Sequence, residues 1–140
     1  MNERLKLENQ LCFPLYVCAK EVVRRYTPLL EPFGLTYTQY IVMMVLWEHK
    51  KISVKELGKL LYLDSGTLTP LLKKMERSGW LCRKRLEDDE RVVIISITDA
   101  GEVLSERVAE VPVKMAQCVK LENNEALQLY TLLNKMIKTF

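Results

Sequence analysis

The chain has 140 residues and a net charge of +3, and 49% of its residues are hydrophobic while 28% are charged. This length and composition suit one globular domain with a buried core and exclude a disordered chain. The small net charge does not by itself indicate a nucleic-acid partner. Its distribution is more informative, because residues 51–97 hold ten Lys or Arg against seven Asp or Glu.

Targeting and metal-binding signals are not visible in the sequence. The first ten residues, MNERLKLENQ, carry charges of both signs and lack the apolar core of a signal peptide. The longest apolar run, Ile41–Trp47, is far shorter than a membrane span. We therefore predict a cytoplasmic protein that does not enter the membrane. The cysteines lack C-x-x-C spacing and indicate neither a metal site nor a cofactor; they are Cys12, Cys18, Cys82 and Cys118.

An apolar periodicity over about residues 7–30 predicts a long first helix. Pro14 predicts an irregular or short first turn, and Pro28 and Pro32 mark the end of the helix. Two adjacent apolar stripes predict a helix that is buried over much of its circumference, more than a small monomer usually offers. The stripes are Leu11, Leu15, Cys18, Val22 and Leu29, and beside them Cys12, Tyr16, Ala19, Val23 and Tyr26.

The next predicted helix begins after Thr36, which can cap it, and is apolar on every side. We expect it to be the buried central helix of the domain. Residues 51–54 favour a short strand. The single histidine, His49, is predicted to face solvent at the end of this helix.

Two further helices follow in close succession. Residues VKELGKLL after Ser53 predict a short helix, and Tyr62 with Leu63 form the turn after it. Asp64 can cap the next helix, and Gly79 stands where that helix ends. Its buried face has helical spacing and consists of Leu68, Leu71, Leu72 and Met75.

A charged turn at residues 87–90 then joins two β-rich runs, Trp80–Leu86 and Arg91–Ile97, into a hairpin. Helix, turn, helix and hairpin in this order predict a winged helix-turn-helix, with the hairpin as the wing. The predicted fold is therefore mainly α with a small β-hairpin, an α+β fold. We place the winged helix-turn-helix at about residues 36–98.

The C-terminal part is again helical. Thr98 opens a predicted helix that continues to Lys120 with a kink at Pro112, and residues 122–140 are predicted to form a closing amphipathic helix. We predict that residues 1–140 form a single domain. The terminal helices, about residues 7–31 and 98–140, have apolar faces left uncovered, which predict that two chains form a homodimer through them. A two-fold dimer presents two recognition helices to a palindromic site.

The polar face of the helix after Asp64 predicts contacts to double-stranded DNA. Short hydroxyls near its N-terminus can reach base edges in the major groove. From Lys73 to Arg85 there are six basic residues and one acidic residue, which suits phosphate neutralisation. The predicted DNA-contacting residues of the helix and hairpin are Ser65, Thr67, Thr69, Pro70, Lys73, Lys74, Arg77, Arg83 and Arg85.

The segment YLDSGTLTPLLKKME, together with the later Asp89-Glu90-Arg91, resembles the MarR family of dimeric bacterial transcription regulators. The resemblance implies that the helix after the turn enters the major groove and that Arg91 enters the minor groove. Asp89 would brace this arginine. A narrow minor groove attracts arginine, and a carboxylate two residues away can orient its guanidinium.

The segment LENQLCFPLY is similar to the OhrR branch of the MarR family, whose members are repressors that sense organic hydroperoxides. The resemblance implies that Cys12 is the peroxide-reactive thiol and that Tyr26 and Tyr37 are its hydrogen-bonding partners. Oxidation would release the operator. Some relatives have a second cysteine that forms an intersubunit disulfide, and Cys118 occupies a comparable place.

The residues agree with this hypothesis, because a phenol can donate a hydrogen bond to a thiolate and raise its reactive fraction. Tyr16 lies four residues after Cys12 and can do so within one chain. Tyr26 lies 14 residues after Cys12, roughly 21 Å along a straight helix, so its contact requires the other subunit. Cys18 and Cys82 are predicted to pack in the core.

The sequence leaves two alternatives to the peroxide sensor open. A MarR-type regulator can instead be released by the reversible binding of a small phenolic or anionic metabolite, and a winged helix can also bind protein. A thiol-dependent enzyme is the weakest alternative. Such an enzyme needs catalytic side chains grouped around its cysteine. The only histidine, His49, lies beside two lysines, with no glycine-rich loop or pair of carboxylates nearby. We therefore predict a regulator without enzymatic activity.

Overall fold

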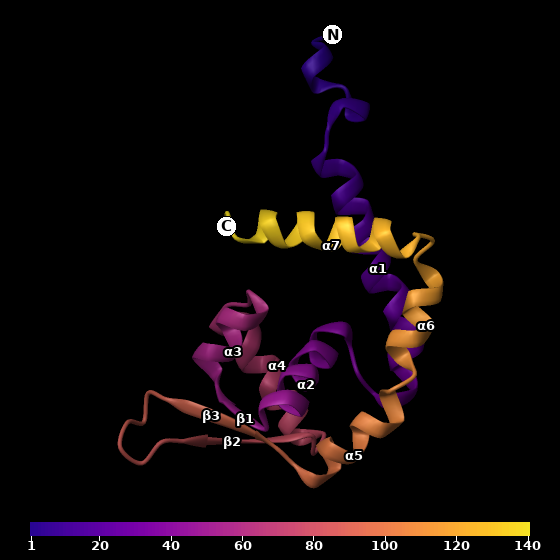
Figure 1. The fold of residues 1–140 in the computed structure, drawn as a ribbon. Coiled ribbons are helices and arrows are strands. Elements are labelled where there is room, and N and C mark those ends of the chain that lie inside the picture. Colours follow the sequence, from indigo (N-terminus) through magenta and orange to yellow (C-terminus); the bar gives the residue numbers. More distant parts are fainter.

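The computed structural model describes residues 1–140 as a mainly helical chain with a three-stranded sheet (Figure 1). The predicted fold class, a winged helix-turn-helix with added helices, is confirmed. The elements in chain order are three 3-10 turns (Glu3–Leu5, Leu7–Asn9 and Glu31–Phe33), α1 (Cys12–Leu30), α2 (Tyr37–His49), β1 (Lys51–Ser53), α3 (Val54–Leu61), α4 (Ser65–Arg77), β2 (Leu81–Arg85), β3 (Val93–Ile97), α5 (Asp99–Val108), α6 (Val111–Cys118) and α7 (Asn123–Ile137).

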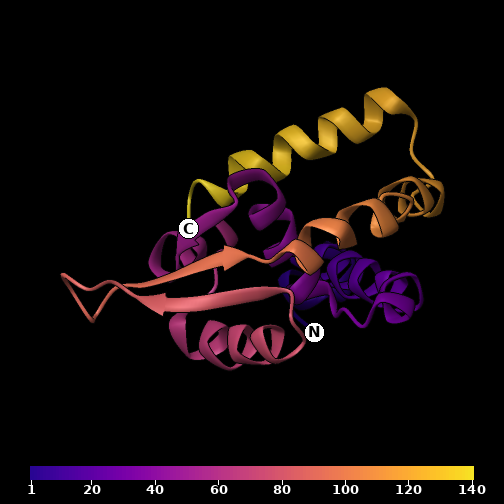
Figure 2. The ribbon, with the colours of Figure 1, turned by 90° about the horizontal axis from the view of Figure 1, so that it is seen from below.

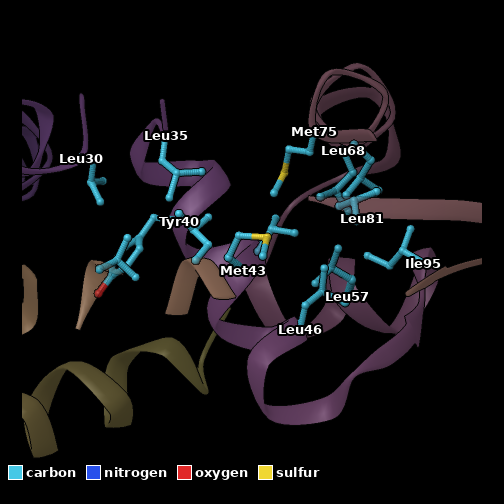
Figure 3. Close-up of a cluster of buried hydrophobic side chains, with 14 of the residues drawn as sticks. Leu30, Leu35, Tyr40, Met43, Leu46, Leu57, Leu68, Met75, Leu81 and Ile95 are labelled. Carbon is cyan, nitrogen blue, oxygen red and sulfur yellow. The ribbon is translucent and has the colours of Figure 1, made fainter. Parts of the chain in front are cut away.

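Helix α2 is the centre of the hydrophobic core, as its apolar sequence predicts. Val42, Met43 and Leu46 are completely buried. Figure 3 shows Met43 between the Leu30 end of the core and the side chains of the winged unit. Thr36 begins the helix with a reciprocal cap: its hydroxyl accepts a hydrogen bond from the backbone N–H of Gln39, and the Gln39 side chain accepts one in return.

Helices α3 and α4 form the predicted helix-turn-helix, and both begin at a capping side chain. The Ser53 hydroxyl accepts a hydrogen bond from the backbone N–H of Glu56 at 3.1 Å, and the Asp64 carboxylate accepts one from that of Thr67 at 3.2 Å. Hydrogen bonding by Thr67, first from its side chain and then from its backbone N–H, lowers the pKa of Asp64. Helix α4 ends at Arg77, and Gly79 follows in the left-handed conformation with a φ of 85°.

The sheet is antiparallel with the strand order β1-β3-β2, so β2 is an edge strand. Leu81 pairs with Ile97 and Arg85 with Val93, which places the turn of the hairpin between residues 86 and 92. The predicted third strand, β1, is present. Figure 2 shows the hairpin, residues 81–97, extending well beyond the helices on one side of the molecule. This hairpin is the wing.

The terminal helices differ from the prediction in their boundaries. Helix α1 begins at Cys12 and not near Leu7, which lies in a separate 3-10 turn. This start places Pro14 in the first turn, where a missing backbone N–H removes no intrahelical bond. The predicted single kinked helix over residues 98–120 is two helices, α5 and α6. They separate before Pro112, which stands in the first turn of α6.

Most apolar residues of the terminal helices are exposed in the single chain. Helix α1 buries only Leu30, and α7 buries no residue. Leu11 is 76% exposed and Leu127 65%. One chain alone therefore does not provide the burial that the two stripes of α1 predict. Figure 1 shows α7 set apart from the winged unit and the N-terminal segment extending away from it.

No single helix has the length and hydropathy of a membrane span. One pair of helical segments, Cys12–Phe33 and Tyr37–His49, meets the criteria only when taken together, and it is bent by 70° at its break.

Candidate DNA interface and redox site

The residues predicted to contact bases lie at the exposed N-terminal half of α4. Ser65 and Thr67 are exposed and Thr69 is half-buried, while the predicted contacts further along are exposed: Pro70, Lys73, Lys74 and Arg77. A groove of about 760 Å³ runs between α3, the start of α4 and the wing. Ser65, Thr69 and Arg91 all line this groove, so the helix and the wing present one continuous surface.

Two further lysines of this surface were not among the predicted contacts. Lys55 and Lys59 of α3 line the same groove as Arg91 and are exposed. They stand four residues apart, on one face of the helix. This four-residue spacing, on a helix predicted to precede the recognition helix, could have identified them from the sequence as further candidates for phosphate contacts.

At the tip of the wing, Asp89 and Arg91 form the brace that the family resemblance implies. The Asp89 carboxylate accepts hydrogen bonds from Nε of Arg91 at 3.1 Å, from Nη2 at 3.3 Å and from the backbone N–H at 3.1 Å. These bonds lower the pKa of Asp89. The Arg91 side chain is 91% exposed. The guanidinium is therefore oriented from within the chain and remains accessible to an anionic partner.

The two predicted arginines on β2 have different surroundings. Arg85 is exposed, and its Nη1 donates to the carbonyl oxygen of Glu90 at 2.7 Å. The Arg83 side chain is only 20% exposed and lies against Glu76 of α4. Among the predicted DNA contacts, Arg83 is thus the one charged group that is largely withdrawn from solvent.

Two of the tyrosines expected beside the redox cysteine are brought together by α1 and α2. The ring centroids of Tyr26 and Tyr37 lie 4.7 Å apart. Burial, and secondarily the proximity of Tyr37, raises the pKa of Tyr26, which keeps its hydroxyl protonated and able to donate. Tyr40 lies close to both rings, 5.7 Å from that of Tyr26 and 6.4 Å from that of Tyr37. Tyr40 was not predicted as part of this cluster, although its position three residues after Tyr37 on the same helix could have indicated it.

The cysteine itself is not part of this cluster within one chain. Cys12 is exposed at the start of α1, while Tyr26 stands 14 residues later on the same helix, roughly 21 Å away along its axis. Tyr16 makes no hydrogen bond to Cys12; its ring is exposed, with the Lys20 ammonium 5.5 Å from the centroid. A single chain therefore does not assemble the proposed thiolate site.

The other cysteines are separate from one another. Cys118 is exposed at the end of α6, where its thiol donates to the carbonyl oxygen of Lys114 at 3.5 Å. Cys18 is also exposed, so the prediction that it packs in the core is wrong for the single chain. It lies on α1, whose apolar stripes this chain does not cover. Cys82 is half-buried on β2, in agreement with a packing role.

No metal-binding cluster accompanies these residues. His49 is exposed near the end of α2, as predicted, and its nearest charged partner is Glu48 at 4.0 Å. No group of three or more His, Cys, Asp or Glu side chains is placed to hold a metal ion.

The fold and the exposed basic surface define a winged-helix DNA-binding protein. Residues 24–108 match the family described as transcriptional regulator SarA/Rot. The organic hydroperoxide resistance transcriptional regulator of Bacillus subtilis is 44% identical over 137 residues, which cover 98% of this chain and 93% of that protein. The chain belongs to the MarR-type transcriptional regulators, in the branch of the organic hydroperoxide resistance regulator, and it is a repressor homologue rather than an enzyme.

Solved structures support the same family. Reduced AbfR bound to DNA, a protein of Staphylococcus epidermidis, is 36% identical with a TM-score of 0.84, and the match covers 99% of this chain and 94% of that one. A disulfide-formed AbfR structure is also 36% identical but has a TM-score of 0.72, over 98% of this chain and 93% of that one. The conformation of this chain is thus more similar to the reduced, DNA-bound form.

Proposed function

We propose that this protein is a homodimeric, cytoplasmic repressor that binds a palindromic operator and leaves it when an organic hydroperoxide oxidises Cys12. The observation that carries the proposal is the separation of Cys12 from the Tyr26–Tyr37 cluster within one chain. A thiolate site completed by the partner subunit would connect oxidation directly to the geometry of the dimer.

The DNA contacts would divide between two grooves. The start of α4, with Ser65, Thr67 and Thr69, suits base edges in the major groove, and Arg91 suits the minor groove. Phosphate contacts would come from the flanking exposed cations. We assign this role to Lys55, Lys59, Lys73, Lys74, Arg77 and Arg85.

The dimer would be formed by the terminal helices. Exposing the apolar side chains of α1 and α7 to water is unfavourable in free energy. Their burial against a second copy of the chain would therefore stabilise the dimer. A two-fold axis through these helices would present two α4 helices to half-sites one DNA turn apart, roughly 34 Å. The operator would therefore be a palindrome.

Oxidation would begin at the Cys12 thiolate, which attacks the terminal oxygen of the hydroperoxide. The O–O bond breaks and an S–O bond forms, so the sulfur becomes a sulfenic acid and the peroxide leaves as an alcohol after taking a proton. Tyr26 and Tyr37 of the partner subunit would donate hydrogen bonds to the thiolate and favour that reactive form. Neutral phenols also suit an apolar organic peroxide.

The second step would form a disulfide. The thiol of Cys118 of the partner subunit attacks the sulfenic sulfur, an S–S bond replaces the S–O bond, and water leaves. This chain has a TM-score of 0.84 to the reduced AbfR–DNA complex and 0.72 to the disulfide form, which supports a conformational change when the disulfide forms. Such a change would move the two α4 helices out of register with successive major grooves.

The test follows thiol oxidation and DNA release in the same sample. The reduced protein is bound to a duplex that it has selected from a randomised pool, and then titrated with cumene hydroperoxide or linoleic acid hydroperoxide. We expect two thiols per chain, those of Cys12 and Cys118, to disappear in step with DNA release, and dithiothreitol to restore both the thiols and DNA binding. Thiol oxidation with no release would contradict the proposal. Release by a phenolic or anionic compound, with peroxide having no effect, would favour the metabolite-binding alternative.

A further inference from the structure

The recognition helix and the wing are joined by a pair of charged residues, Glu76 on α4 and Arg83 on β2. One carboxylate oxygen of Glu76 accepts a hydrogen bond from the backbone N–H of Arg83 at 2.8 Å. The other oxygen lies 3.9 Å from Nη1 of the same residue. Because β2 is the edge of the sheet, this amide has no strand partner on its outer side. Glu76 therefore satisfies it from the neighbouring helix.

Arg83 is poorly placed to bind a phosphate itself. Its side chain is 20% exposed, and its Nε is buried without a hydrogen-bond partner. An arginine that neutralises phosphate presents its guanidinium to solvent, as Arg91 does at the wing tip. The position of Arg83 between α4 and β2 points instead to a role within the protein.

The connection that this pair spans is a potential pivot. Helix α4 and β2 meet at Gly79, whose φ is 85°, and the backbone N–H of Trp80 bonds to the carbonyl oxygen of Met75 at 3.1 Å. The wing tip lies about eight residues further on, roughly 26 Å along an extended strand. A swing of about 10° at the pivot would displace the tip by roughly 4.5 Å, most of the width of a minor groove of about 6 Å.

We propose that Glu76 and Arg83 form a positioning pair that sets the angle between the recognition helix and the wing. Arg83 then supports DNA binding through Glu76 and not by neutralising a phosphate. This inference rests on the proposed function, because it requires Arg91 at the wing tip to reach the minor groove while α4 occupies the major groove.

The experiment compares Arg83→Gln and Glu76→Gln with the wild type in the full-length reduced protein. Affinity for a duplex selected by the wild type from a randomised pool is measured across a range of salt concentrations, with hydroxyl-radical footprints of the minor groove. Arg85→Gln is the matched control on the same strand. Glu76→Gln keeps an acceptor for the Arg83 amide, and circular dichroism confirms that each variant is folded at the temperature of the measurement.

We expect both variants to bind about tenfold more weakly, with an unchanged salt slope and a weaker footprint where the wing lies. Their double variant should be little weaker than either single one, because the two residues act as a unit. Arg85→Gln should instead reduce the salt slope, by roughly 0.9 for each phosphate that is no longer neutralised.

Arg91→Ala is measured alongside and should weaken the minor-groove footprint. If it does, two outcomes would overturn this inference while leaving the proposed function intact. One is a reduced salt slope for Arg83→Gln, which would make Arg83 a direct phosphate contact. The other is wild-type affinity and footprint in both variants. If Arg91→Ala itself leaves the footprint unchanged, the wing contact of the proposed function fails, and the inference fails with it.

Discussion

Asp89 holds Arg91 at three points, two on the guanidinium at 3.1 and 3.3 Å and one on the backbone N–H at 3.1 Å. A flexible arginine at the tip of a hairpin samples many rotamers, and ordering it on DNA is entropically unfavourable. The carboxylate removes part of that freedom before DNA arrives. Asp89 thus pre-organises Arg91 for the DNA contact that the proposed function assigns to it.

The first prediction concerns this pair. Arg91→Ala should weaken binding to most DNA sequences and lower the salt slope by roughly one unit for each phosphate that the variant fails to neutralise. Thr69→Ala is the contrasting variant and should change sequence preference instead, because it removes a candidate base contact. Binding by electrophoretic shift at several salt concentrations distinguishes them. Wild-type affinity of Arg91→Ala at physiological salt would show that the wing does not contact DNA.

The lowered pKa of Asp89 gives a prediction about pH. A carboxylate with a lowered pKa keeps its interaction at all pH values above its ordinary pKa, about 3.9, and loses it only as the pH falls through the lowered value. The ratio of operator affinities of the wild type and Asp89→Asn should therefore be constant between about pH 5 and pH 8. Affinities measured across this range check it. A ratio that changes within the range would mean that another group titrates with the brace.

The second group of variants tests the trigger. Cys12→Ser should fold, dimerise and bind DNA, yet remain bound when organic peroxide is added, because it lacks the sulfur that is oxidised. Fluorescence anisotropy of labelled DNA during peroxide addition measures this. Cys18→Ser is a matched control on the same helix and should respond like the wild type. A Cys12→Ser protein that still dissociated would place the sensor at another cysteine.

Tyr26→Phe and Tyr37→Phe should slow the oxidation of Cys12 without abolishing it. Each change deletes one hydroxyl that can donate to the thiolate while keeping the ring and its packing. Rates of thiol oxidation under excess peroxide measure the effect, and the DNA affinity of the reduced proteins should not change. Tyr62→Phe, at the exposed C-terminal end of α3, is the control for the oxidation rate. Equal rates in all variants would exclude the tyrosines from the site.

Two glycines give opposite predictions for stability. A Cβ on Gly101 would overlap the carbonyl oxygen of Trp80 and lie 2.8 Å from Cγ1 of Ile97, so Gly101→Ala should destabilise the fold by about 1–3 kcal/mol. A Cβ on Gly66, in the first turn of α4, meets only a carboxylate oxygen of Asp64 at 3.4 Å. Gly66→Ala should be neutral or stabilising by up to about 1 kcal/mol. Urea unfolding at fixed protein concentration tests both, and a stable Gly101→Ala would disprove the close packing.

The winged unit could be predicted because its signals are local. Thr36 and Asp64 cap the helices that they were expected to cap, and the apolar spacing of α4 corresponds to its buried face. Each such signal depends on residues within one turn or one hairpin. Short-range hydrogen bonds and periodicity therefore specified the winged helix-turn-helix almost completely.

The terminal helices were predicted less well, for two reasons. Where α1 begins depends on competition between a 3-10 turn at residues 7–9 and an α-helix, which apolar periodicity does not resolve. Cys18 and most of α1 are exposed in the single chain, and only the proposed dimer would cover them. The contact between Glu76 and Arg83 joins a helix to a strand, so charge counting along the sequence did not reveal it.

The last prediction concerns Cys118, which distinguishes a two-cysteine sensor from a one-cysteine sensor. Peroxide should convert the wild type to a covalent dimer on a non-reducing gel, joined from Cys12 to Cys118 of the partner subunit. Both thiols are free and exposed in the chain, at the start of α1 and at the end of α6. A disulfide requires Cα atoms within about 7 Å. We expect the helix around Cys12 to shift as the bond forms, because a pair that was already close would oxidise without producing a signal.

Cys118→Ser separates the two mechanisms. Without the second thiol the sulfenic acid has no protein partner, so this variant should form no covalent dimer and should accumulate sulfinic or sulfonic acid at Cys12 under excess peroxide. Mass mapping of the oxidised protein identifies both products. Oxidation of Cys12 in this variant should not be reversed by dithiothreitol, because these higher acids are not reduced by thiols, whereas the wild type should recover its thiols. If Cys118→Ser released DNA reversibly and the wild type never cross-linked, Cys12 would act with a small-molecule thiol or alone, and Cys118 would have no part in sensing.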